Sequence, residues 1–378
     1  MIPIIVLYWA SVYSYIYILS AYSSDMGATA SMVGMITGAY GLIQLFCRIP
    51  IGILSDYREN QRKFFFFGVG SSLLAAVGLY FAKTPVMLML FSALSGVAVS
   101  TWAVFMSGYC TFFPPEKTTR VVGSLNVMTS SGQLIGTFGS GLVAQVFGTK
   151  RASFVVAAAV ALLVLLMLLF VEDTYQKGAA KQQPKDFIAV VTQDKTLRFF
   201  SVLAAILNFM NFAAINSFVP LILTNLGASS MQISLGSTAS VLASVISTPF
   251  SCTIMKDKLG VKTTTIIGFI LLALSMFFFP RVQSISAVIA LEAVSGLGRG
   301  LMFSLLMACA TEKLSPQLRS TGMGTFQAIY AVGMFLGPAI AGVAIDVFSF
   351  SQAFTAMSVI CVLVAGYLGL SKRVKVHV

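Results

Sequence analysis

Two charged residues stand inside one long apolar run, which covers residues 285–311. Glu292 and Arg299 are seven positions apart there, with Gly296 and Gly300 close by. Seven residues are about two helical turns, so both side chains lie on one face, about 10 Å apart along the axis and too far for a direct ion pair. A buried carboxyl group can take up and release a proton, whereas arginine stays charged. We expect Glu292 to bind a proton or a cationic group, and Arg299 to bind an anionic or zwitterionic part of a small molecule.

A second arginine, Arg48, lies in another apolar run, eight residues before Asp56. A charged residue inside a membrane span is costly and usually faces a cavity or a partner. Because Arg48 is only about two turns from the polar end of its run, we favour a role in a gate over contact with the bound molecule. Near that end of the run, the Arg48 side chain would extend toward water or pair with the polar groups around Asp56.

Neutral polar side chains inside other apolar runs are candidates for lining the same cavity. They are Asn126, Gln327, Asn208, Asn211, Tyr13 and Tyr17. Asn126 and Gln327 are 201 residues apart, the interval at which other features of the chain repeat. For any single tyrosine, ordinary packing is the commoner role.

Several kinds of chemistry have no residues to support them. The single histidine, His377, lies in the C-terminal tail, and the five cysteines all fall in apolar runs without a CxxC pair. The sequence has no G-x(4)-G-K-[ST] phosphate loop. We therefore expect no metal, no cofactor and no ATP hydrolysis. An intramembrane enzyme, such as an acyl or glycan transferase, would need a cluster of acidic residues and histidines, and only Glu292 is central.

The composition requires a membrane. Hydrophobic residues make up 57% of the chain and charged residues 10%, with a mean hydropathy of +0.91. Charged residues commonly make up about a quarter of a soluble protein. Apolar runs of about 20 residues, long enough to span a bilayer as helices, recur throughout the chain. We predict twelve spans, at 2–23, 29–54, 64–82, 86–112, 121–147, 153–171, 198–224, 230–254, 263–281, 285–311, 320–345 and 352–371.

The basic residues indicate how these spans are oriented. Eighteen of the 24 Lys and Arg residues fall in the even-numbered loops, the central linker and the C-terminal tail. Four fall in the odd-numbered loops: Lys83, Lys150, Arg151 and Arg281. Positive residues favour the cytoplasmic side, so both termini are predicted to be cytoplasmic. The +12 net charge then faces the anionic lipid surface, which removes the reason to expect nucleic acid as a partner.

The two halves of the chain have glycines at matching positions, at a constant interval of 201 residues. Gly132 repeats as Gly333, and Gly136 repeats as Gly337. We predict an N-terminal six-helix half at 1–172, a cytoplasmic linker at 173–197 and a C-terminal six-helix half at 198–378. Parallel halves in an apolar chain are typical of secondary transporters, in which the substrate site lies between the halves near mid-membrane.

The end of the second span carries a recognisable motif. Gly52, Leu54, Ser55 and Asp56 match the start of the signature G-x-L-[SA]-D-[RK]-x-G-[RK]-[RK], while Tyr57 replaces its first basic residue. With twelve spans in two halves, the chain resembles the major facilitator superfamily. The resemblance implies an all-α membrane fold of twelve helices that works by alternating access.

The resemblance also implies a gate. It places Asp56 against the start of the eleventh span, and by mirror symmetry Asp257 against the start of the fifth. Gly337 and Pro338 match the Gly-Pro pattern of a gating helix in antiporters, although Thr137 replaces the proline in the fifth span. Close packing between helices is the alternative explanation for these glycines.

We expect a monomer that moves a small solute across the cytoplasmic membrane, coupled to protons, with export by antiport slightly favoured. Uptake by symport, or uniport, of a small anionic or zwitterionic metabolite is the alternative. A scaffold or sensor that does not transport is a further one, in which replacing Glu292 and Arg299 would have no effect.

Overall fold

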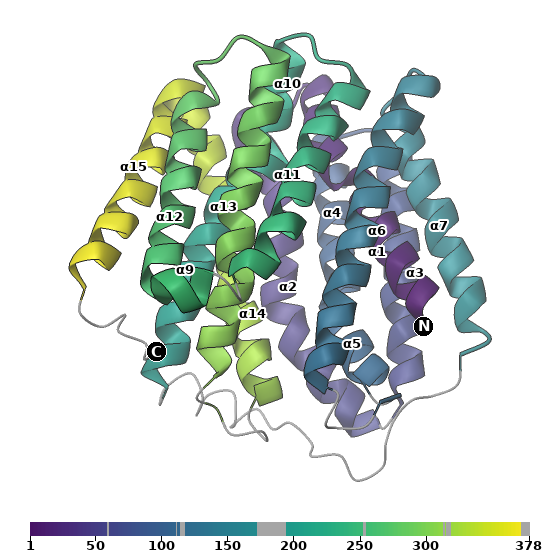
Figure 1. The fold of residues 1–378 in the computed structure, drawn as a ribbon. Coiled ribbons are helices and arrows are strands. Elements are labelled where there is room, and N and C mark those ends of the chain that lie inside the picture. Colours follow the sequence, from purple (N-terminus) through teal and green to yellow (C-terminus); the bar gives the residue numbers. More distant parts are fainter. Residues whose placement is uncertain are drawn as a thin grey trace.

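The computed structural model describes most of the chain, and all of the secondary structure in the described part is helical. The described residues are 1–58, 60–110, 112–113, 118–171, 194–251, 255–312, 314 and 319–371, without the side chains of 56–58, 107, 118–123, 256 and 319–321. The helices stand side by side as one bundle (Figure 1).

The N-terminal half supplies six of the predicted spans. Its helices are α1 (Ile2–Asp25), α2 (Ala30–Arg58), α3 (Gln61–Phe81), α4 (Pro85–Ser100), α5 (Trp102–Cys110), α6 (Thr118–Val146) and α7 (Ala152–Leu168). The fourth span is divided at Thr101 into α4 and α5, and every other predicted span in this half corresponds to one helix.

The C-terminal half supplies the other six. Its elements are α9 (Lys195–Asn211), η2 (Phe212–Phe218), α10 (Val219–Asn225), α11 (Ser230–Phe250), α12 (Lys256–Phe278), α13 (Ile285–Thr311), α14 (Arg319–Val347) and α15 (Phe350–Leu370). Among the described residues, ten helical segments are long and apolar enough to cross a membrane, and α7 is a shorter apolar helix. With α6, which is rich in glycine, serine and threonine, they make up the twelve predicted spans.

Polar side chains explain where several helices begin. The Asn60 side chain accepts a hydrogen bond from the backbone of Lys63 at the start of α3. Asp194 accepts from the first turn of α9, so this helix starts three residues before the predicted position 198. Ser229 and Gln232 form a reciprocal capping box on α11. Each cap satisfies backbone N–H groups that have no partner within the helix.

The seventh span is not a continuous α-helix, contrary to the sequence prediction. Residues Phe212–Phe218 form a π-helix between α9 and α10. Pro220 lacks an N–H group, so the regular hydrogen bond to the carbonyl of Asn216 is absent. The hydroxyl of Ser217 donates to the carbonyl of Phe212 at 2.8 Å, and this bond supports the wider turn.

Glycines pack the helices of each half in the same way. Gly132 and Gly136 lie against the backbone of α1, where an added Cβ would come within 2.4 Å and 2.3 Å of carbonyl oxygens. Gly333 and Gly337 lie against α9 at similarly short distances. The repeat that the sequence shows is therefore a repeated packing of the fifth span on the first, and of the eleventh on the seventh.

The two halves meet at one end of the bundle and at its centre. We call the end where α7 finishes and α9 begins the linker face, at the bottom of Figure 1, and the other end the opposite face. Near the opposite face, Gly34 of α2 packs on the carbonyl of Pro338 in α14, and Gly342 of α14 packs on Ala30. Gly141 of α6 packs on Ser234 of α11 in the same region.

Candidate functional site

Glu292 is an isolated carboxyl group in the interior. It lies on α13 and is 0% exposed, and neither of its side-chain oxygens has a hydrogen-bond partner. Gly236 of α11 leaves the space that the carboxyl group occupies, since a Cβ at that position would lie 2.4 Å from Oε1. An ionised carboxylate without partners is very costly in such a place. The site therefore suits a group that is neutral in this conformation.

Arg299 lies two turns further along α13 and is half-buried. Its guanidinium lies near the side chains of Tyr17 and Tyr13, and Tyr17 also lies near Glu292. The two tyrosine rings are 5.9 Å apart. Among the described residues no ion pair joins Arg299 to Glu292, in agreement with their predicted separation. The structure thus brings Tyr13, Tyr17, Arg299 and Glu292 into one region.

Arg48 belongs to a second polar group, which crosses between the halves. It is 4% exposed, and its guanidinium donates to Gln327 at 2.9 Å and to Tyr330 at 3.2 Å, both on α14. It also donates to Gln44 at 2.6 Å, one turn toward the opposite face. Arg48 therefore does not reach for water at the linker face, and its side chain points away from Asp56 and into the bundle.

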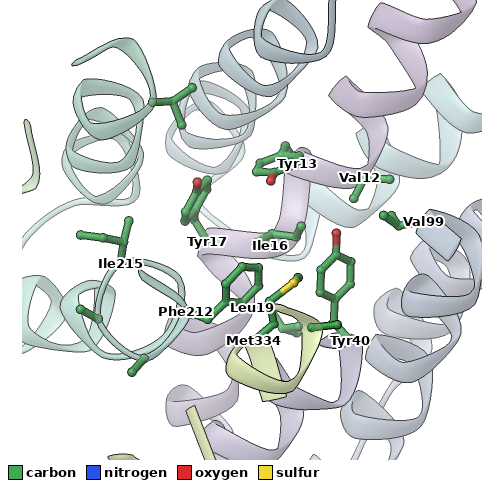
Figure 2. Packing of buried hydrophobic residues seen from close by; sticks show 14 of the residues in the cluster. Val12, Tyr13, Ile16, Tyr17, Leu19, Tyr40, Val99, Phe212, Ile215 and Met334 are labelled. Carbon is green, nitrogen blue, oxygen red and sulfur yellow. The ribbon is translucent and has the colours of Figure 1, made fainter. Parts of the chain in front are cut away.

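Aromatic and apolar side chains of both halves meet at the centre of the bundle. Figure 2 shows Tyr13 and Tyr17 of α1 near Tyr40 of α2, Phe212 of η2 and Met334 of α14. The rings of Tyr40 and Phe212 are stacked, with centroids 6.1 Å apart.

A small cavity lies beside this stack and has a volume of about 10 Å³. It is lined by Tyr15, Ile16, Leu19, Thr37, Tyr40, Ser92, Ser95, Phe212 and Asn216. This is room for about one water molecule. The halves are consequently closed to a solute at this level.

The remaining predicted site residues are more scattered. Asn208 and Asn211 are buried on α9, and Asn208 donates to the carbonyl of Ala204 in its own helix. Asn126 is exposed on α6. Gln327 differs from the predicted asparagines in that its side chain accepts a hydrogen bond from an interior arginine, Arg48.

The predicted gate is described only in part. Asp56 lies in the last turn of α2, and its side chain is outside the described residues, so its role stays a prediction. Gly52 has no atom near its Cβ position. Asp257 is exposed in the first turn of α12, before the break at Gly260, whose φ is 77°. The side chains at the start of α6, its predicted partner, are outside the described residues.

The other two predicted gate residues pack in different ways. Gly337 lies against Phe209 within its own half, whereas the carbonyl of Pro338 meets Gly34 of the other half. Pro338 thus belongs to the contact between the halves at the opposite face.

Sequence reasoning missed a contact between the halves at the opposite face. The carboxylate of Asp346, near the end of α14, accepts hydrogen bonds from the backbone N–H groups of Ala30 and Ser31 at 3.0 Å and 2.8 Å, and from the hydroxyl of Ser31. It therefore caps the N-terminal end of α2, where a negative charge is favourable. The sequence shows an acidic residue at the end of one span and a Ser/Thr-rich start of another. It does not show that these two segments are in contact.

Comparison with known proteins identifies the family. The model of the Major Facilitator Superfamily matches residues 1–202 and again 201–377. The chain belongs to this superfamily. It is 22% identical over 370 residues to an uncharacterised MFS-type transporter of Methanocaldococcus jannaschii, a match that covers 94% of this chain and 93% of that protein. A shorter match, 27% identical over 134 residues, covers 35% of the chain and 34% of the quinolone resistance protein NorA of Staphylococcus aureus.

Solved structures of superfamily transporters have the same fold. The nucleoside transporter NupG aligns with a TM-score of 0.80 over 97% of both chains, at 14% identity. A bacterial homologue of the human lysosomal transporter Spinster aligns with a TM-score of 0.77 over 99% of this chain and 95% of that one, at 15% identity. The protein is thus a multi-pass membrane transporter of the superfamily and not an enzyme, as predicted.

Proposed function

We propose that the protein moves a small anionic or zwitterionic solute across the cytoplasmic membrane by alternating access, driven by protons. The termini and the linker face would be cytoplasmic, as the distribution of basic residues predicts. Export in exchange for protons is slightly favoured, and the partial likeness to a quinolone resistance protein supports this direction.

The observation that carries the proposal is the isolation of Glu292. A carboxyl group that is fully buried and unpartnered is stable when it holds a proton and becomes costly when it loses it. Release of the proton therefore requires a conformation in which water or a cation reaches Glu292. A group with this property couples proton binding to the opening and closing of the transporter.

The contacts between the halves support alternating access. The halves are closed near the opposite face, where Gly34 packs on Pro338 and Asp346 caps α2. Such contacts must break in the alternate state. Arg299, half-buried beside Tyr13 and Tyr17, is the proposed anchor for the anionic part of the solute.

Reconstituted liposomes test the proton coupling, once metabolite differences between cells with and without the protein have identified a solute. Glu292→Gln keeps the size of the side chain but cannot release a proton, so it should retain solute exchange and lose accumulation driven by a pH gradient. Arg299→Ala should instead weaken the affinity for the solute. Glu312→Gln, an exposed change just after α13, is the control. A Glu292→Gln variant that still concentrates the solute under a pH difference would refute the coupling.

A further inference from the structure

Arg48 carries a buried charge that no protein carboxylate balances through a hydrogen bond in the described part of the chain. Its three acceptors, on Gln44, Gln327 and Tyr330, are all neutral, and its Nε has no partner. A buried cation is usually paired with an anion, because desolvating the charge is expensive.

The guanidinium of Arg48 is directed away from the backbone position of the acidic residue on the same helix. Asp56 is eight residues from Arg48, or about 12 Å along α2. The guanidinium of Arg48 bonds to Gln44, which lies in the other direction. The charge of Arg48 is therefore directed toward the middle of the bundle, where the halves meet.

The second interior arginine borders the same set of tyrosines from the other half. Tyr330 accepts a hydrogen bond from Arg48, and Tyr13 has both Tyr330 and Arg299 as neighbours. Arg48 of α2 and Arg299 of α13 thus come from different halves, and each lies near tyrosines of the interior. Two interior arginines from different halves can bind the two acceptor groups of one molecule.

The interior charges indicate how much negative charge such a molecule carries. Within the described spans, Arg48 and Arg299 contribute two positive charges away from the ends of the bundle, and Glu292 is the carboxyl group that accompanies them. When Glu292 holds a proton, both positive charges need a negative charge from the solute. Guanidinium groups bind carboxylates and phosphates in the same forked geometry.

We propose that the transported solute is a small organic dianion, with one anionic group bound by Arg48 and the other by Arg299. This inference rests on the proposed function, which assigns Arg299 to the solute, and it adds Arg48 as a second binding residue. Gln44, Gln327 and Tyr330 hold the Arg48 guanidinium in place before the anion arrives. Because Gln327 and Tyr330 belong to the other half, binding of the anion also changes a contact between the halves.

Ligand-induced thermal stabilisation of the purified protein tests the proposal. Linear dicarboxylates from succinate to suberate are compared with monocarboxylates of the same chain lengths, at equal ionic strength and neutral pH. We expect at least one dicarboxylate to bind roughly tenfold more tightly than its monocarboxylate, because it gains one charge-assisted interaction with Arg48. Arg48→Gln should abolish this advantage, whereas Arg299→Gln should weaken the binding of both series.

Arg281→Gln, which removes an exposed arginine stacked on Phe277, is the control and should change neither series. The proposal is overturned if no dicarboxylate binds more tightly than its monocarboxylate, a comparison that needs only the wild-type protein. It is also overturned if the advantage persists in Arg48→Gln. The binding differences do not depend on whether Glu292 couples transport to protons. The proposal of a dianionic solute and the proposal of proton coupling can therefore be refuted separately.

Discussion

The carboxylate of Asp346 should hold the opposite face closed. It joins the end of α14 to the start of α2 through two backbone N–H groups and one hydroxyl. These bonds link the two halves, so they exist only while this face is shut. Asp346→Asn should therefore increase the population in which the opposite face is open.

The size of the effect follows from what the substitution removes. Asparagine keeps one acceptor oxygen, so it loses the charge and at least one of the three hydrogen bonds. A charge at a helix N-terminus is worth about 0.3–1 kcal/mol, and a net hydrogen bond about 0.5–1.5 kcal/mol. Because Asp346 is exposed and screened by solvent, we take about 1 kcal/mol, which is about a fivefold change in the ratio of open to closed molecules.

Distance measurements between spin labels provide the assay. Lys83 and Gln283 are exposed in the loops α3–α4 and α12–α13, one in each half at the opposite face. Cysteines at these two positions, in a background without the five native cysteines, report the separation of the halves. Asp346→Asn should increase the longer-distance population about fivefold.

A matched control comes from the same face. Asp25 forms an ion pair with Lys150 at 2.7 Å, and both residues belong to the N-terminal half. Asp25→Asn removes the same charge without touching a contact between the halves, so it should leave the distances unchanged. An Asp346→Asn variant with the wild-type distribution, or an equal change in Asp25→Asn, would refute the reasoning.

Two further predictions concern packing and topology. Gly34→Ala places a methyl group 2.1 Å from the carbonyl oxygen of Pro338, so it should shift the halves away from this closed state by about tenfold in the same assay. Gly70→Ala, where no atom lies within 4 Å, should have no such effect, and an equal shift would contradict the packing argument. Single cysteines at positions 83, 150 and 281 should react with a membrane-impermeant reagent from outside the cell, and labelling only from the cytoplasmic side would contradict the predicted orientation.

The sequence by itself determined the positions of the spans and that they are helical, although the fourth and seventh spans are each divided into more than one element. Hydropathy predicts that each apolar run is a spanning helix, because the backbone N–H and C=O groups of a segment in the bilayer must form hydrogen bonds within that segment. The interval of 201 residues predicted two related halves, and the structure shows Gly132 and Gly333 in equivalent packing. Glu292 and Arg299 stood out because charge inside a span is rare and costly.

Only the tertiary structure decided which side chains face one another. The direction of the Arg48 side chain, toward Gln44 and Gln327 and away from Asp56, depends on which helix lies beside α2. The π-helix depends on local hydrogen bonding around Pro220 that hydropathy does not register. The contact of Asp346 with the start of α2 joins residues more than 300 positions apart. Periodicity fixes the face of a helix on which a residue lies, but the partner of that face is set by how the two halves pack.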